Sequence, residues 1–376
     1  MLTVLTGDII SAGDQVIVER GIALLKHYYP DKNILKLPRW KPIQKDLDQV
    51  NQSDALILLG GPAFQRDLYP GIFPLVRNLD HIKVPIISMG LGSSIIPFNE
   101  NMVKKFRFTE SSFQLLNRLV RDSEMIGVRD YVTKKILENH NIKNVFVTGC
   151  PGWFSLDNLG KPIVVNDIKN VAFATGFRHF RQKSSFYQQL EIMNFLKDYF
   201  DNPKLFCVFQ DSLESDKFKK RKYVSIQRLL ANEAQKLGYE IVDVTGRVKK
   251  MWEVYLTTDI LISYRVHSHI SMLSFGKPSI LISEDSRGYG ANDLIGLKNI
   301  FSYRDENIIF SRLYGYGIFG TVGTKLFPPK TNKRLKKEIS EFLNEEMNNG
   351  FARYAGIHSV LLQYYKNMEK FLLKML

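Results

Sequence analysis

Cysteine is scarce in this chain: Cys150 and Cys207 are the only two among 376 residues. Two cysteines cannot form a disulfide framework, so we expect two buried apolar thiols in a reducing compartment. Long apolar runs are also missing, because none approaches the roughly 18 residues needed to cross a bilayer. The first residues, MLTVLTGDII, lack the basic region and the small-residue cleavage site of a signal peptide and are typical of a first strand. These absences predict a cytoplasmic protein.

The common phosphate loops are missing where two predicted strands end in glycine. Residues 58–62 read LLGGP and residues 89–93 read MGLGS. Neither matches GxGxxG or GxxxxGK[ST], which argues against a Rossmann dinucleotide site or a P-loop at these turns. Glycines after strands let backbone N–H groups approach a ligand closely, although tight turns also use glycine for steric reasons alone. Gly60, Gly61 and Gly92 are therefore candidate substrate-binding residues, with the steric explanation left open.

Positive charge is what the chain has in excess. Its formal net charge is +14, from 52 Lys and Arg against 38 Asp and Glu, and its isoelectric point is near 9.5. Such a balance favours an anionic partner or an anionic surface. The basic residues are interleaved with acids and form no long tract, so solvated helix faces are one explanation and we expect no nucleic acid. An anionic membrane face or a pyrophosphate-linked acceptor is the other.

Short apolar strands alternate with segments of helical period, which predicts an α/β protein with parallel sheets covered on both faces. The expected strands are residues 3–6, 34–37, 55–59, 85–89, 125–128, 145–148, 171–175, 205–209, 240–244, 260–262 and 279–282. A chain of 376 residues exceeds one ordinary core, and the loop-like stretch 157–168 marks a boundary. We assign residues 1–160 to an N-terminal domain, 165–330 to a C-terminal domain and 331–376 to C-terminal helices that pack across both.

The most informative stretch is residues 257–290, TTDILISYRVHSHISMLSFGKPSILISEDSRGYG. Its order of apolar run, polar junction, helical segment, Gly-Lys-Pro turn and second apolar run predicts a βαβ unit. Ligands of such sheets bind beyond the carboxyl ends of the strands, where a helix N-terminus offers unpaired N–H groups. Arg265 and His267 fall at that junction, and together they suit a dianion such as a phosphate ester. His269 points away from His267 on a helix, so we expect a structural imidazole there.

Two further predicted strands lead directly into arginine. Residues 176–181 read GFRHFR, and Arg178 faces the same cleft as Arg265 if both strands belong to one sheet; otherwise it lies on the surface. Asp130 is a good N-cap for the helix that follows it, and Arg129 either reaches the cleft or pins that cap.

The last part of the chain contains one irregular segment and two helices. Residues 312–329, RLYGYGIFGTVGTKLFPP, combine glycine and aromatics without a clear period, as binding loops and lids do. Residues 359–376 carry a wide apolar stripe with three lysines, which fits a helix that packs across the domains or one that lies at a membrane surface.

The chain resembles the polysaccharide pyruvyl transferase family. The resemblance depends first on the R-V-H at residues 265–267, preceded by DILIS and followed by FGKPSI. Gly13-Asp14 before a helix, Gly60-Gly61 after a strand, and VRD with Thr133 four residues beyond Arg129 are similar to further family elements. The match spans residues 5 to 300, and R-x-H in its context is the most specific part.

The resemblance implies two Rossmann-like domains facing a central cleft, as in GT-B glycosyltransferases. It implies transfer of the enolpyruvyl group of phosphoenolpyruvate onto a sugar of a surface polysaccharide, or of its lipid-linked precursor, to give a pyruvate ketal. The N-terminal domain would then hold the saccharide acceptor and the C-terminal domain the donor. Contact with the anionic inner face of a membrane would follow for a lipid-linked acceptor. The implied donor-binding residues are Arg178, Arg265, Val266 and Arg287, with His267 as the general acid.

The chemistry also suits these residue types directly. Phosphoenolpyruvate carries a carboxylate and a phosphate close together, so at least two guanidinium groups are wanted to hold it. A histidine can deliver a proton to the methylene carbon and help phosphate to leave. A carboxylate could accept the proton of the attacking hydroxyl, and Asp14 is our candidate. Nothing in the pattern requires a metal or a cofactor beyond the donor.

Two alternatives remain open at this stage. The first is a GT-B glycosyltransferase that uses a nucleotide sugar, in which Glu284 or Asp285 would bind the ribose. The second is a non-catalytic anion-binding or nucleic-acid-binding protein, in which the arginines contact phosphate without chemistry; steep salt dependence of binding would favour it.

Overall fold

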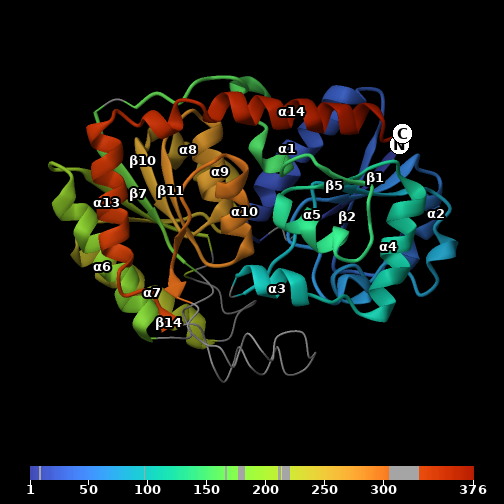
Figure 1. Ribbon diagram of the computed structural model, residues 1–376, viewed down its shortest axis with the longest axis horizontal. Helices are drawn as coiled ribbons and strands as arrows, with labels where there is room; N and C mark the ends of the chain where they lie inside the picture. Colours follow the sequence, from blue (N-terminus) through green and yellow to red (C-terminus); the bar gives the residue numbers. More distant parts are fainter. Residues whose placement is uncertain are drawn as a thin grey trace.

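The computed structural model consists of two α/β lobes that lie side by side (Figure 1). It describes residues 1–7, 10–96, 98–165, 167–176, 183–210, 213, 221–304 and 330–376. Arg178, a predicted donor-binding residue, and the segment 312–329, whose composition is typical of a binding loop or lid, lie outside the described residues. Among the residues that are described, no helix combines the length and the apolar character needed to pass through a membrane.

The N-terminal lobe is built on a parallel four-stranded sheet in the order β2-β1-β3-β4. Its strands are β1 (Leu2–Thr6), β2 (Ile34–Pro38), β3 (Ala55–Leu59) and β4 (Ile86–Met89). A parallel pair, β5 (Ile126–Val128) and β6 (Val145–Val147), lies beside it, and Gly90 N donates to Gly127 O at 3.0 Å. The helices of this lobe are α1 (Ala12–Tyr28), α2 (Leu47–Asn51), α3 (Glu100–Lys105), α4 (Glu110–Asp122) and α5 (Tyr131–Glu138).

The C-terminal lobe contains a parallel six-stranded sheet in the order β12-β11-β10-β7-β8-β9. Its strands are β7 (Asn170–Ala174), β8 (Lys204–Phe209), β9 (Glu240–Asp243), β10 (Ile260–Ser263), β11 (Ser279–Ser283) and β12 (Ile300–Phe301). Its helices are α6 (Lys183–Tyr199), α7 (Arg221–Lys236), α8 (Val248–Thr257), α9 (Val266–Ser274) and α10 (Ser286–Leu294). A short antiparallel pair, β13 (Tyr303–Arg304) and β14 (Lys330–Thr331), stands apart.

The strands form where the sequence places its apolar runs, because parallel strands covered on both faces need apolar side chains on both. Every residue of β1, β3 and β10 is buried. Each expected strand is present to within one residue at either end. The sequence pattern places the R-V-H motif in a polar junction before its helix, whereas α9 already begins at Val266, so the motif caps the helix and forms its first turn.

Each sheet contains a topological switch point, where successive strands are added first on one side of the first strand and then on the other. In the N-terminal lobe β1 is followed by β2 on one side, whereas β3 and β4 lie on the other. In the C-terminal lobe β8 and β9 lie on one side of β7, and β10 to β12 lie on the other. Connections leave such neighbouring strands in opposite directions and open a crevice at their carboxyl ends, which is where open α/β sheets bind ligands.

The two C-terminal helices, α13 (Leu335–Asn348) and α14 (Ile357–Leu373), contact different lobes. On α13, Asn344 Oδ1 accepts a hydrogen bond from the hydroxyl of Tyr199 on α6 at 2.7 Å. On α14, Asn367 Nδ2 donates to the carbonyl of Val147 at 3.1 Å, back in the N-terminal lobe. Figure 1 shows α14 running along the upper edge of the molecule over the first lobe. The apolar stripe of α14 is therefore used for internal packing.

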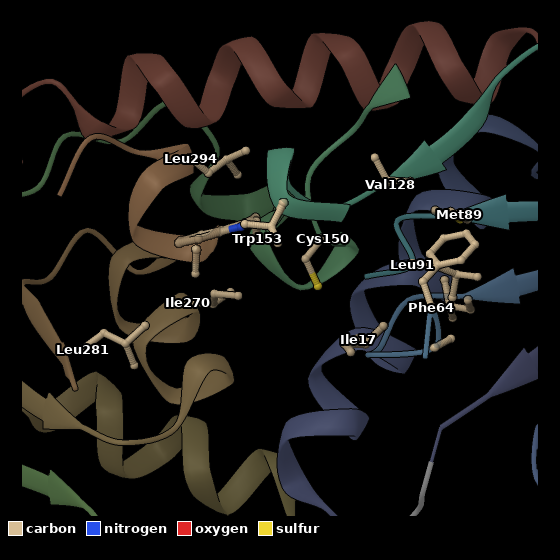
Figure 2. Close-up of a cluster of buried hydrophobic side chains, with 14 of the residues drawn as sticks. Ile17, Phe64, Met89, Leu91, Val128, Cys150, Trp153, Ile270, Leu281 and Leu294 are labelled. Atoms are coloured by element: carbon tan, nitrogen blue, oxygen red, sulfur yellow. The ribbon is translucent and has the colours of Figure 1, made fainter. Parts of the chain in front are cut away.

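One hydrophobic cluster extends across both lobes (Figure 2). Ile17 of α1 and Ile270 of α9 both belong to it and are almost fully buried. Polar contacts also join the lobes: Ile95 N donates to Ser286 Oγ at 2.9 Å, and Ser286 N donates to Ile95 O at 3.1 Å. The interface is thus a continuous packed core with hydrogen-bonded loops beside it.

Candidate active site

The site is organised by the first turn of α9, at the crevice between β7 and β10. Arg265 is the N-cap, and its backbone N–H donates to Ser263 Oγ at 2.8 Å. Its side chain reaches across the crevice, where Nε donates to the carbonyl of Thr175 at 2.8 Å. The motif is therefore tied to the carboxyl ends of both neighbouring strands. The N–H groups of the first helical turn, which have no partner within a helix, add partial positive charge here.

His267 is the second residue of α9 and is only 8% exposed. Its Nε2 is buried and has no hydrogen-bond partner within the described part of the chain. Burial, and after it the positive charges of Arg287, Arg129, Arg20 and Arg265 in that order of effect, together lower the pKa of His267 to about 3. The imidazole is accordingly neutral at pH 7. A buried ring nitrogen without a partner, close to positive charges, suits an anionic ligand whose oxygens can accept a hydrogen bond from that nitrogen.

A small cavity opens beside the imidazole. Its walls come from both lobes and consist of Arg129, Asp130, Cys150, Trp153, Val266, His267, Ile270, Arg287, Gly290 and Ala291. The free volume for a water-sized sphere is about 10 Å³, which suffices for about one water molecule. The predicted residues Val266, His267 and Arg287 are thus brought together, in a closed space.

Arg287 is held at the start of α10. Asp285 caps this helix by accepting from the Arg287 backbone N–H at 2.8 Å, and its carboxylate also accepts from Arg287 Nε at 2.9 Å. The Arg287 side chain is 23% exposed, whereas that of Asp285 is 1% exposed. A buried acid therefore fixes the guanidinium while leaving its far side toward the cavity.

Arg129 reaches the cavity and also braces the cap of α5, so both possibilities considered from the sequence hold. Arg129 Nε pairs with Asp130 Oδ2 at 2.9 Å, and Asp130 Oδ1 accepts from Thr133 N at 2.7 Å. Gly92 lies directly under this guanidinium: a Cβ there would come within 2.0 Å of Arg129 Nε. The steric explanation left open from the sequence thus applies to Gly92, which leaves room for Arg129, while its contact with substrate stays a prediction.

Two glycines allow the lobes to approach each other at the site. A Cβ added to Gly13 of α1 would lie 2.7 Å from His267 Nδ1, and one added to Gly290 of α10 would lie 2.9 Å from Asp130 Cβ. In each pair the glycine belongs to one lobe and its neighbour to the other. The first turn of α1 therefore packs directly against the imidazole presented by α9.

Asp14 follows Gly13 on that turn and lies in the crevice of the N-terminal sheet. Its Oδ2 is 3.6 Å from Arg39 Nη2. Gly60 and Gly61, at the end of β3, have φ angles of +51° and +78°, which favour glycine. A Cβ on Gly61 would lie 2.4 Å from Arg39 Nη1. These glycines shape the surroundings of the Asp14–Arg39 pair.

His269 has the structural position expected of it. Its Nδ1 is 3.0 Å from Ser279 Oγ on β11, the residue is fully buried, and its ring meets Trp153 edge to face. Burial lowers the pKa of His269 to about 3, so this imidazole is neutral as well.

Arg20 faces the site and was missed from the sequence. It lies on the buried face of α1 with its guanidinium 5.4 Å from the ring centres of both Trp252 and Phe275, and Nη1 donates to the carbonyl of Gly152. Burial lowers the pKa of Arg20 to about 10. A signal did exist, because position 20 falls in the apolar period of α1, where a cation is out of place.

Comparison with known proteins agrees with this architecture. Residues 12–286 match the family described as polysaccharide pyruvyl transferase. A search of the curated proteins finds no match. Among solved structures, the fold is similar to that of Staphylococcus aureus MnaA with UDP, at a TM-score of 0.57 and 13% identity, with 100% of this chain and 97% of that chain covered. The UDP-GlcNAc 2-epimerase of Neisseria meningitidis bound to UDP-GlcNAc gives a TM-score of 0.50 at 12% identity, with 99% and 98% covered.

At such identities these structures establish the fold alone, and they confirm the predicted GT-B-like arrangement of two Rossmann-like domains. The family match covers most of the chain, including the R-V-H turn, Asp14 and the glycine turns. The chain belongs to the polysaccharide pyruvyl transferase family.

Proposed function

We propose that this transferase moves the enolpyruvyl group of phosphoenolpyruvate onto a sugar of a surface polysaccharide, or of its lipid-linked precursor, and forms a pyruvate ketal. One observation carries the proposal. The buried, partnerless Nε2 of His267 lies among guanidinium groups from both lobes, at the crevice where an α/β sheet binds its ligand. A small ligand with a carboxylate and a phosphate matches that charge.

Donor binding changes the proton affinity of His267. Burial and the neighbouring cations together hold its pKa near 3. A donor with about three negative charges neutralises the cations, so their part of the shift is removed and the pKa rises toward the range in which imidazole carries a proton. His267 then becomes an acid only when donor is present, which prevents it from donating its proton elsewhere.

The reaction balances with these groups. Protonated His267 gives its proton to the methylene carbon, which becomes the methyl group, while an acceptor hydroxyl bonds to the neighbouring carbon and loses its proton. The bond from that carbon to the phosphate oxygen then breaks, and phosphate leaves with the electron pair. A second hydroxyl of the same sugar bonds to the carbon, loses its proton and closes the ketal. General acid–base assistance of this kind contributes about 10² to 10⁴ in rate.

The closed cavity has a consequence for binding. It has room for about one water molecule, so the donor enters only if lining side chains such as Arg287 and Arg129 move apart. We place the reaction in the cytoplasm; the net charge of +14 supports contact with an anionic inner membrane face, where a lipid-linked acceptor would lie.

A nucleotide-sugar glycosyltransferase is the second candidate, because the similar solved structures contain UDP or UDP-GlcNAc. The two acids considered for ribose binding do not favour it. Asp285 caps α10 and pairs with Arg287, and Glu284 is 5% exposed with its Oε1 2.9 Å from where a Cβ on Gly176 would lie. Both carboxylates are engaged inside the lobe.

Calorimetric titration separates the candidates. Phosphoenolpyruvate should bind, and titrations in two buffers of different ionisation enthalpy should reveal uptake of a proton that the His267→Asn variant lacks. UDP-GlcNAc and UDP-glucose serve as comparison ligands. Tight binding of a UDP-sugar, with no binding of phosphoenolpyruvate, would contradict the proposal and favour a nucleotide-sugar glycosyltransferase. Donor binding without proton uptake would remove His267 as the acid.

A further inference from the structure

The N-terminal lobe has its own crevice, at the carboxyl ends of β1 and β3, and the Asp14–Arg39 pair lies in it. Arg39 directly follows β2, and its backbone N–H donates to Thr6 O at the end of β1 at 3.0 Å. The next residue, Trp40, is 46% exposed. A carboxylate, a guanidinium and a half-exposed indole thus lie at one end of one sheet, outside the cavity around His267.

We propose that Asp14, Arg39 and Trp40 form the saccharide subsite of this enzyme. Trp40 is the platform on which the apolar C–H face of the sugar packs, Asp14 accepts the proton of the attacking hydroxyl, and Arg39 positions Asp14. The proposal rests on the proposed pyruvyl transfer and supplies its acceptor side.

The carboxylate and guanidinium are held in a space that two glycines leave open. A Cβ on Gly7 would lie 2.9 Å from Asp14 Oδ2, and a Cβ on Gly61 would lie 2.4 Å from Arg39 Nη1. Side chains at either position would push the pair apart. The Asp14 and Arg39 side chains are 16% and 18% exposed, so the pair is sheltered but reachable by a hydroxyl group.

Trp40 differs from the other two tryptophans. Trp153 is 2% exposed and Trp252 is half-buried beneath Arg20, so each has an evident packing role. Trp40 lies in the turn closed by the hydrogen bond from Lys41 N to Pro38 O at 3.2 Å. A large aromatic side chain that is half open and directly follows Arg39 in the chain is suited to a ligand that is apolar on one face and hydroxylated at its edge, as a pyranose is.

The subsite is aligned with the donor through α1. Gly13 faces His267, and Asp14 is the next residue on the same helical turn. Successive helical residues point about 100° apart, so the imidazole and the carboxylate flank one turn of α1 from two sides. The proposal requires that a hydroxyl bound to Asp14 reach, past this turn, a donor held by His267. In the step, the hydroxyl oxygen bonds to the central donor carbon and its proton passes to Asp14.

The test uses a panel of methyl glycosides of common hexoses and N-acetylhexosamines with the full chain. Tryptophan fluorescence reports binding, and release of inorganic phosphate from phosphoenolpyruvate reports turnover. At least one glycoside should quench the fluorescence of the unmodified protein, and Trp40→Phe should lose most of that change. Trp40→Ala should raise the acceptor KM about tenfold or more with little change in kcat, whereas Asp14→Asn should lower kcat about a hundredfold.

Further variants identify the roles. Arg39→Lys should retain more activity than Arg39→Met, since only the former keeps a cation beside Asp14. Leu256→Ala is the matched control, because this side chain is 55% exposed at the amino-terminal side of β10, away from both crevices. It should behave as the unmodified protein in every assay.

The possible outcomes all decide the matter. An acceptor KM that is unchanged in Trp40→Ala overturns the subsite, as does a panel in which no glycoside perturbs Trp40. Loss of binding to phosphatidylglycerol vesicles in Trp40→Ala, with glycoside kinetics intact, would instead assign this indole to a membrane. Failure of phosphoenolpyruvate to bind at all would sink the proposed function and is detected separately by the calorimetric titration.

Discussion

The two crevices of this molecule occupy the same topological position and differ in electrostatics. Around the neutral, deeply buried imidazole of His267, Arg129 and Arg287 line the cavity, each paired with an acid, and Arg20 and Arg265 add positive charge. At Asp14 one acid faces one base, both are partly exposed, and Trp40, the residue after Arg39, is 46% exposed. Arginines that outnumber the acids around a buried imidazole favour an anionic ligand, whereas a balanced acid–base pair suits a neutral polyol. The fold thus provides two equivalent places, and the side chains decide which substrate each one takes.

Among the tests of this difference between the crevices, we expect the largest effect from removal of the His267 imidazole. His267→Asn keeps a polar side chain in the first turn of α9 but has no titratable nitrogen, so phosphate release from phosphoenolpyruvate should fall by about 10² to 10⁴. Glycoside binding should persist, because the N-terminal crevice is untouched. Circular dichroism and the midpoint of thermal unfolding verify that the variant is folded. If a folded His267→Asn variant still releases phosphate from phosphoenolpyruvate at the original rate, the His267 crevice is not the donor site.

Two glycine substitutions should separate the crevices kinetically. The new methyl group of Gly13→Ala would press on His267, and a displacement near 1 Å lowers kcat about a hundredfold. Gly61→Ala would instead displace Arg39, so we expect an acceptor KM raised about tenfold and a donor KM left alone. Steady-state kinetics with each substrate varied in turn measures both.

The matched control for Gly61→Ala is Gly238→Ala. Gly238 also has a positive φ, +93°, but a Cβ there would meet nothing within 4 Å. Both variants should lose stability by about 1 to 2 kcal/mol from the left-handed backbone, and only Gly61→Ala should change the acceptor KM. The same KM shift in both would mean that backbone strain, not Arg39, is responsible.

Acid should destabilise the donor side. The pKa values of His267 and His269 are lowered from 6.5 to about 3 in the folded protein, so between these values the unfolded chain binds more protons. The stabilisation is complete above pH 6.5 and is lost as the pH falls toward 3, at roughly 1.4 kcal/mol per pH unit for each histidine. Urea unfolding measured from pH 7 to pH 4 should show this slope.

The same measurement distinguishes the two histidines. Phosphoenolpyruvate should flatten the part of the slope that belongs to His267, because the bound donor stabilises its protonated form, and His269→Gln should flatten the remainder. If neither the ligand nor the substitution changes the pH dependence of the free energy of unfolding, the two histidines are not its source.

The sequence predicted what local patterns encode. The βαβ unit, the R-V-H turn at its junction and the cap at Asp130 follow from apolar runs, helix signals and short spacing, and the structure contains all three. Arg20 and Arg39 could not be placed in the same way, because their importance depends on residues more than a hundred positions away or on another strand of the sheet. Gly13 looked like a helix start, and only packing of the two lobes shows that its missing side chain accommodates an imidazole.

The return of α14 to the first lobe limits how the enzyme opens. The chain passes between the lobes once before β7 and again between α13 and α14, and Figure 1 shows both passages along the same upper edge. Two connections on one side resist relative twisting of the lobes, and the hydrogen bonds between Ile95 and Ser286 also hold the lobes together. Cutting the chain just before α14 should therefore remove one of the two connections without touching either crevice.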